Sequence, residues 1–166
     1  MGVAGTGKST VGAALAHALG LAFVEGDAYH PATNVQRMAA GIPLTDADRS
    51  PWLDALAARL REAEQAGAGL VMACSALKRS YREVLRAGAA SVTFIYLHGD
   101  QGLLAKRIAQ RHQHFMPASL LESQLAALEA PTTEECAWAY DIGLNPRAIV
   151  ASLLERIDAG KQAMPP

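Results

Sequence analysis

The chain has 166 residues, of which 51% are hydrophobic and 19% charged, and its formal net charge is −1. These values predict one globular domain with a substantial core. The balanced charge gives no electrostatic reason to bind nucleic acid or an anionic membrane. No apolar run approaches the roughly 18 residues of a membrane span. Cys74 and Cys136 lack C-x-x-C spacing, and we expect Cys74, inside an apolar run, to be a buried reduced thiol of a cytoplasmic protein.

The first ten residues hold the most specific motif of the chain. Residues 2–9 match G-x-x-x-x-G-K-[ST], the phosphate-binding loop or P-loop. Glycines let backbone N–H groups turn toward phosphate oxygens, Lys8 brings positive charge to the β- and γ-phosphates, and Ser9 offers a hydroxyl to Mg²⁺. The helix that follows directs its positive end at the same anion. The expected ATP-binding residues are Gly2, Val3, Ala4, Gly5, Thr6, Gly7, Lys8, Ser9 and Thr10.

A P-loop normally follows a strand and opens a helix. The helix is present in the sequence pattern, but only Met1 precedes the motif. The first strand is therefore expected to be missing from this chain. A loop without this support could bind nucleotide and not catalyse a reaction, which is one alternative interpretation.

Downstream of the loop, helical and strand patterns alternate. Strands are predicted at 21–24, 70–74, 92–97 and 137–142. Helices are predicted at 9–19, 32–40, 51–65, around Tyr81 to Leu85, at 101–111, after Pro117 and at 145–159. Residues 45–50 are expected to form a polar loop, with Ser50 capping the next helix. The alternation predicts a single α/β domain over 1–166, with a parallel sheet between two helical layers.

Two polar features point to a second substrate. Asp27 follows the strand at 21–24 and would emerge at the carboxyl edge of the sheet, where open α/β sheets bind ligands. Asp27 could equally be a helix cap or a turn residue. Arg107 and Arg111 lie one helical turn apart before a basic connection, which fits a mobile lid or an ordinary solvated helix hairpin.

The central strand ends in Cys74-Ser75, without the Asp of a Walker B site, and the guanine signature Asn-Lys-x-Asp is absent from the sequence. A short chain with a P-loop and these features fits a small phosphotransferase. Such an enzyme needs an acceptor pocket opposite the loop and a lid that keeps water from the γ-phosphate.

Five further stretches carry specific residue patterns: Gly26–Asn34 with Arg37 and Met38, Gly41–Leu53, Cys74–Arg82, Phe94–Asp100 and His114–Met116. With the P-loop they resemble the gluconokinase family of small P-loop kinases, which is related to shikimate kinase and adenylate kinase. The match runs nearly end to end, and its motifs separate gluconokinases from shikimate kinases. The resemblance implies ATP- and Mg²⁺-dependent phosphorylation of the 6-hydroxyl of D-gluconate, giving 6-phospho-D-gluconate, by a cytoplasmic homodimer.

The resemblance also assigns roles to single residues. Lys8, Asp27 and Arg111 are the implied catalytic residues, and Ser9 and Asp27 the implied Mg²⁺ ligands. Asp27 would orient or deprotonate the acceptor hydroxyl, and Arg49 is the first choice for the substrate carboxylate. The implied substrate contacts are Asp27, His30, Arg49, Lys78, His114 and Gln124. Within a lid of about 107–124, Arg107 would stack on adenine and Arg111 would reach the transferring phosphate, while Arg147 would flank the adenine.

Two other activities are alternatives at this point: phosphorylation of a related sugar acid, and phosphorylation of a nucleoside monophosphate. The gluconokinase-type motifs and the lack of a nucleobase-acceptor signature argue against the second.

Overall fold

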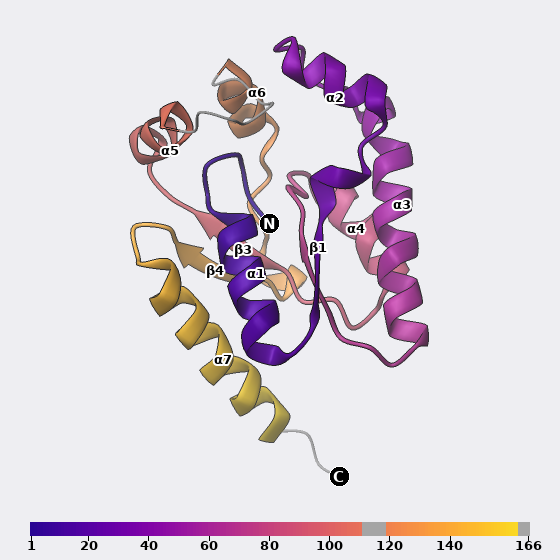
Figure 1. The fold of residues 1–166 in the computed structure, drawn as a ribbon, viewed down its shortest axis with the longest axis vertical. Coiled ribbons are helices and arrows are strands. Elements are labelled where there is room, and N and C mark those ends of the chain that lie inside the picture. Colours follow the sequence, from indigo (N-terminus) through magenta and orange to yellow (C-terminus); the bar gives the residue numbers. More distant parts are fainter. Residues whose placement is uncertain (111–118, 163–166) are drawn as a thin grey trace.

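The computed structural model describes residues 1–110 and 119–162 as alternating helices and strands (Figure 1). The elements in chain order are α1 Lys8–Leu19, β1 Ala22–Glu25, the 3₁₀ helix η1 Gly26–Tyr29, α2 Ala32–Ala39, α3 Asp46–Gln65, β2 Leu70–Ala73, α4 Arg79–Gly88, β3 Ile95–His98, α5 Gln101–Ala109, α6 Ser119–Ala127, the 3₁₀ helix η2 Thr133–Glu135, β4 Trp138–Asp141 and α7 Pro146–Gln162. The predicted α/β class with parallel strands is confirmed.

The strands pair in two separate parallel sheets of two strands each. In one, β1 pairs with β2 from Ala22 opposite Leu70 to Glu25 opposite Ala73. In the other, β3 pairs with β4 from Ile95 opposite Trp138 to His98 opposite Asp141. Within the described residues, β2 and β3 do not pair with each other, so the single continuous sheet that the alternation predicts is divided between them.

The N-terminal residues lie at the division between the sheets. The Leu97 N–H donates to the Met1 carbonyl at 2.9 Å, and the Met1 amino group donates to the carbonyl of Ile95. The Gly2 N–H donates to the Ser75 carbonyl, just beyond β2, at 3.1 Å. Behind Met1, the space between β2 and β3 forms an apolar cavity of about 400 Å³. Two backbone residues therefore bridge the sheets at one end of this cavity.

Helices cover the strands in two packed pairs, α1 against α7 and α3 against α4 (Figure 1). One core cluster joins α1, α7 and β3 through residues such as Leu15, Leu97 and Leu153. A second joins α3 and α4 around Trp52 and Leu85. Burial of these apolar side chains is the main favourable contribution to the fold. No helix among the described residues is long and apolar enough to cross a membrane.

The start of α3 differs from the prediction. The helix begins at Asp46, inside the expected polar loop, and Pro51 lies within it. The reason is a capping box: the Asp48 N–H donates to the Thr45 hydroxyl at 3.2 Å, and the Thr45 N–H donates to the Asp48 carboxylate at 2.8 Å. These two bonds satisfy N-terminal donors of the helix one turn before Ser50 could.

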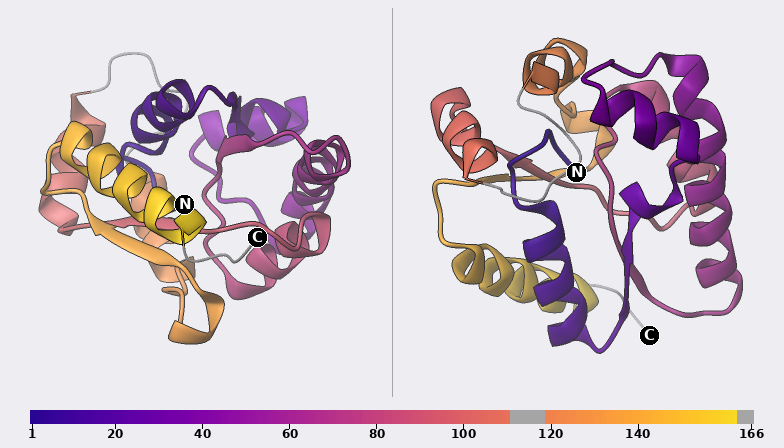
Figure 2. Two further views of the ribbon diagram at one scale, coloured as in Figure 1. Left: turned by 90° about the horizontal axis from the view of Figure 1, so that it is seen from below. Right: turned by 45° about the horizontal axis from the view of Figure 1, so that its top comes forward.

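Local caps set the ends of two helices, and the expected burial of Cys74 is confirmed. Gly20 ends α1 in the left-handed conformation at φ 67°. Asp100 caps α5 by accepting from the Leu103 N–H at 3.0 Å. Cys74 is buried, and burial raises the pKa of its thiol to about 12. Figure 1 and the right view of Figure 2 place α2, α5 and α6 at the same end of the molecule as the loop before α1, so this end can form a site.

Candidate functional site

The P-loop folds as its motif predicts. Gly2, Gly5 and Gly7 all have positive φ angles. At Gly2, where φ is 138°, an added Cβ would lie 2.3 Å from the Leu97 carbonyl oxygen, so the close approach of loop and strand needs glycine. Gly7, at φ 87°, turns the chain into the first turn of α1. The loop thus presents the N-terminus of α1 to an anion.

Two side chains bond back to the loop itself. The buried Thr6 hydroxyl donates to the Val3 carbonyl at 2.9 Å. The Lys8 ammonium donates to the same carbonyl at 3.0 Å, which holds its charge over the centre of the loop. In this position, Lys8 can meet the phosphates that the backbone N–H groups bind.

A cavity of about 340 Å³ lies on one side of the loop. Thr6, Gly7 and Thr10 line it from the P-loop, and Arg107 of α5 lines the opposite wall. The Arg107 guanidinium donates to the Ile142 carbonyl at 2.9 Å, which fixes its position. The cavity is further lined by Val11, Gln110, Ile142, Leu144, Pro146 and Ile149. This largely apolar space beside a phosphate loop suits a nucleobase and ribose.

A second, more polar cavity lies on the other side of the loop. It is lined by Ala4, Gly5, Lys8, Ser9, Asp27, His30, Met38, Arg49, Ser75 and Gln124. Asp27, His30 and Arg49 were predicted as acceptor-side residues, and the structure brings all three together with Lys8 and Ser9. The P-loop, whose N–H groups and Lys8 can bind phosphate, therefore lies between two cavities. The cavity lined by Arg107 is called the nucleotide-side cavity below, and the one lined by Asp27, His30 and Arg49 the acceptor-side cavity.

His30 and Asp27 owe their positions to Trp52, which is fully buried on α3. The Trp52 indole N–H donates to the Gly26 carbonyl at 2.8 Å and so fixes the start of η1, where Asp27 lies. The His30 ring stacks on Trp52, with centroids 4.3 Å apart and planes 13° apart. Burial lowers the pKa of His30 to about 4, with Asp27 opposing and Arg49 adding to the shift. Its Nδ1 is buried without a hydrogen-bond partner among the described residues.

The helices around this cavity are tied to each other. The buried Asn34 amide on α2 donates to the Asp48 carbonyl on α3 at 2.6 Å. Arg37, one turn on, lies 3.7 Å from the Asp48 carboxylate, so the face that Asn34 and Arg37 share packs on α3. On α6, the Gln124 carbonyl oxygen accepts from the Ala4 N–H of the P-loop at 2.6 Å.

Some predicted residues lie elsewhere. The Lys78 ammonium is 2.7 Å from the Asp46 carboxylate and does not line the acceptor-side cavity. Hydrogen bonds from Lys78 and Tyr81 lower the pKa of Asp46. Arg147 is exposed and does not line the nucleotide-side cavity, where Leu144 and Pro146 are found instead. Arg111 and His114 lie outside the described residues, and their roles stay predictions.

Sequence reasoning did not assign Met38 and Ser75 to the site. Met38 was noted only as part of a family pattern, and its helical spacing is equally typical of a core residue. Ser75 follows β2 directly, so its position at the carboxyl end of a parallel strand was the available signal.

Comparison with known proteins gives the family. A family model described as an AAA domain matches residues 1–131. The gluconokinase of Gluconobacter oxydans (strain 621H) is 49% identical over 159 residues, covering 96% of this chain and 89% of that protein. The chain belongs to the gluconokinase family.

Solved structures agree with this membership of the gluconokinase family. A crystal structure of a gluconokinase from Sinorhizobium meliloti 1021 matches with a TM-score of 0.86 at 45% identity, covering 99% of this chain and 95% of that one. An unliganded sugar kinase from Janibacter sp. HTCC2649 matches with a TM-score of 0.91 at 45% identity, covering 95% and 91%. The two cavities flanking the P-loop thus belong to a P-loop kinase fold.

Proposed function

We propose that this chain transfers the γ-phosphoryl group of ATP to the 6-hydroxyl of D-gluconate, giving 6-phospho-D-gluconate and ADP. The observation that carries the proposal is the P-loop standing between a largely apolar cavity and a polar one. This arrangement suits a nucleotide on one side, an acceptor on the other, and the transferring phosphate between them. The family membership supports gluconate as the acceptor.

The acceptor side fits a polyhydroxy acid. Arg49 lines the cavity, and its guanidinium, which stays charged, can form a bidentate pair with a carboxylate. Asp27 accepts a hydrogen bond from the 6-hydroxyl and so aims its oxygen at the γ-phosphate, or takes its proton. His30, which is neutral near pH 7, adds an uncharged contact to a substrate hydroxyl.

The donor side stabilises developing negative charge. Lys8 and the backbone N–H groups of the P-loop face the phosphates, and Arg111 is proposed to reach the moving phosphoryl group. Ser9 and Asp27 line the same cavity and offer the oxygen ligands that Mg²⁺ prefers, so they are the proposed metal ligands. When bound, Mg²⁺ would neutralise phosphate charge. Arg107 is proposed to contact the adenine.

Substrate assignment is tested by coupling ADP release to a spectrophotometric readout with gluconate, shikimate and other six-carbon sugar acids offered separately. We expect gluconate to give by far the highest kcat/KM, and mass spectrometry with NMR to place the phosphate at carbon 6. Efficient turnover of another acid, with none of gluconate, would contradict the proposal.

The role of Lys8 is tested by Lys8→Ala. Removing a charge that contacts the transferring phosphate is expected to lower kcat by at least about 100-fold. Arg59→Ala, which removes an exposed charge on α3, is the control and is expected to retain turnover. Turnover of Lys8→Ala close to that of the unaltered chain would overturn the site assignment.

A homodimer and a cytoplasmic location are part of the same proposal, and their support is the family resemblance. Sedimentation equilibrium tests the first: a single species with the mass of one chain, 17.5 kDa, would contradict it.

A further inference from the structure

The acceptor-side cavity has two walls that come from distant parts of the chain. One is Ser75, in the segment between β2 and α4, and the other is Gln124 of α6. Each wall is bonded to the P-loop: the Ser75 carbonyl accepts from the Gly2 N–H at 3.1 Å, and the Gln124 side chain accepts from the Ala4 N–H at 2.6 Å. The position of each wall relative to the P-loop therefore sets the shape of the acceptor-side cavity.

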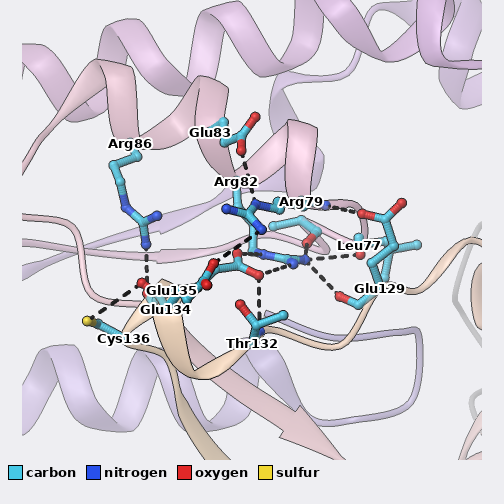
Figure 3. A network of polar contacts seen from close by, with 11 residues as sticks. Leu77, Arg79, Arg82, Glu83, Arg86, Glu129, Thr132, Glu134, Glu135 and Cys136 are labelled. Carbon is cyan, nitrogen blue, oxygen red and sulfur yellow. Dashed lines mark hydrogen bonds and ion pairs between the residues drawn. The ribbon is translucent and has the colours of Figure 1, made fainter.

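Behind the cavity, one buried side chain joins the same two walls. Arg82 of α4 has no exposed surface, and its Nη1 donates to the carbonyls of Ala76 at 3.2 Å and Leu77 at 3.1 Å. The same nitrogen donates to the carbonyl of Glu129, two residues after the end of α6, at 3.0 Å. Figure 3 shows Arg82 at the centre of this network.

The junction is reinforced around Glu129. Its N–H donates to the Leu77 carbonyl at 2.9 Å, and its carboxylate accepts from the Arg79 N–H at 2.6 Å. Glu129, just after α6, is thus bonded to Leu77, Arg79 and Arg82 of the stretch that follows β2.

Glu135 of η2 sets the orientation of Arg82. Its carboxylate accepts from Nε at 2.5 Å and from Nη2 at 2.8 Å, and it is 3% exposed. Thr132 holds that carboxylate in turn by donating its N–H at 3.2 Å. A bidentate pair fixes the guanidinium plane, which leaves Nη1 directed at the three carbonyls. Ala76, at φ 43°, is held in the left-handed region by these contacts.

The contacts form a closed ring. It runs from the P-loop to Ser75, through Ala76 and Leu77 to Arg82, on to Glu129 and α6, and back through Gln124 to Ala4. We propose that Arg82, oriented by Glu135, is a positioning residue that sets both walls of the acceptor cavity relative to the P-loop. The substrate side of this proposal rests on the proposed function. The nucleotide-side cavity contains neither wall, so the ring acts on the acceptor.

The test variant is Arg82→Met with Glu135→Met. Replacing both partners avoids an unpaired buried charge, which alone could unfold the protein. Arg82→Lys keeps the charge and loses the fork. Arg79→Ala is the matched control, because Arg79 lies one turn earlier on α4 and its exposed side chain pairs only with Glu83 and Glu134 among the described residues.

We expect the double variant to remain folded by circular dichroism. It should raise KM for gluconate by about tenfold or more, which corresponds to the loss of roughly one hydrogen bond to the substrate. KM for ATP should change less than twofold. Arg82→Lys should fall between the double variant and Arg79→Ala, which should match the unaltered chain. Equal changes in both KM values, or none in either, would overturn the proposal.

A second readout does not depend on the substrate. Native-state hydrogen exchange at the Ala4 N–H, which Gln124 bonds across the ring, should speed up by about tenfold or more in the double variant. If the unaltered chain does not phosphorylate gluconate, the proposed function fails and this exchange rate alone decides the positioning role. Unchanged exchange at Ala4 in a folded double variant would refute it.

Discussion

His30 is a histidine whose surroundings keep it neutral. Burial against Trp52 lowers its pKa to about 4, so the imidazole carries no charge across the range in which free histidine titrates. We therefore expect KM for gluconate to show no ionisation near pH 6.5. Initial rates from pH 5 to 8 provide the measurement. A step between pH 6 and 7 that disappears in His30→Gln would contradict this.

The same shift makes stability depend on pH. The folded-state pKa lies below the unfolded value of 6.5, so the unfolded chain binds more protons between pH 6.5 and 4. The contribution of His30 is fully present above pH 6.5 and declines as pH falls toward 4. Between pH 7 and pH 5, urea unfolding should show a smaller loss of the free energy of unfolding for His30→Gln than for the unaltered chain. His17→Gln, at an exposed histidine on α1, is the control, and an equal loss in both variants would count against the account.

Trp52 joins the core to the site through one hydrogen bond. Trp52→Phe removes the donor to the Gly26 carbonyl and leaves that buried oxygen without its partner. We expect a loss of about 1–3 kcal/mol in the free energy of unfolding. Because Asp27 follows Gly26, kcat should fall as well. Urea unfolding and steady-state kinetics measure the two effects, and a variant with unchanged kcat would show that this bond does not position Asp27.

Residues of the site were predictable where chemistry and spacing coincide. The P-loop motif located the backbone and Lys8 groups that can bind phosphate. Asp27 was predicted from its place after a strand and from the family patterns, and His30 and Arg49 from the family patterns; all three line one cavity. Arg82 and Glu135 were not found, because each is a charged residue on a short helix and such residues are normally solvated. Their burial depends on pairing across 53 positions, which local patterns do not report. The ion pair of Lys78 with Asp46 was not predictable for the same reason, since the two residues are 32 positions apart, and its substrate contact stays a prediction.

At the scale of elements, helix and strand types followed from periodicity, and their ends were set by caps. The start of α3 was wrong by several residues because Pro51 and Ser50 suggested a later beginning, although Thr45 and Asp48 have capping-box spacing. The division into two sheets was not predictable from strand patterns, since strand pairing is a tertiary property.

The α3 and α4 helices are in close backbone contact at Gly88. A Cβ added there would lie 2.4 Å from the Ala57 carbonyl oxygen and 2.9 Å from its carbon. Gly88→Ala must push the helices apart, and we expect a loss of about 1–3 kcal/mol in the free energy of unfolding. Gly160→Ala is the control, because Gly160 lies in α7 with no atom within 4 Å of an added Cβ. At that position, the higher helix propensity of alanine should raise the free energy of unfolding by up to about 1 kcal/mol. Chemical denaturation measures both variants. If Gly88→Ala and Gly160→Ala changed the free energy of unfolding in the same direction, the packing argument would be contradicted.

At the scale of the whole molecule, an apolar cavity lies at the junction between the two sheets. Met1 and Gly2 connect β2 and β3 at one end only, and the apolar cavity behind them is about 400 Å³. The cavity lies between Leu70–Met72 on one side and Phe94–Ile95 on the other. Empty apolar volume of this kind lowers stability because the lining atoms lack packing partners.

The direction of Met1 defines what would fill this cavity: an extended apolar segment joined to its amino group and parallel to β2 and β3. We expect four β-branched residues added before Met1 to pair with both sheets, each burying an apolar side chain worth about 1.5–3 kcal/mol against roughly 1–2 kcal/mol of ordering entropy. A net gain of a few kcal/mol would raise Tm by about 4 °C or more.

The same extension changes how stability depends on pH. Burial lowers the pKa of the Met1 amino group to about 5, so the present chain loses stability as pH falls from 8 to 5. A peptide N–H at this position would not titrate. Thermal unfolding at pH 8 and pH 5 measures both effects, with a four-residue Gly-Ser extension as the control. Equal Tm values for the two extensions would show that the cavity does not accept a strand.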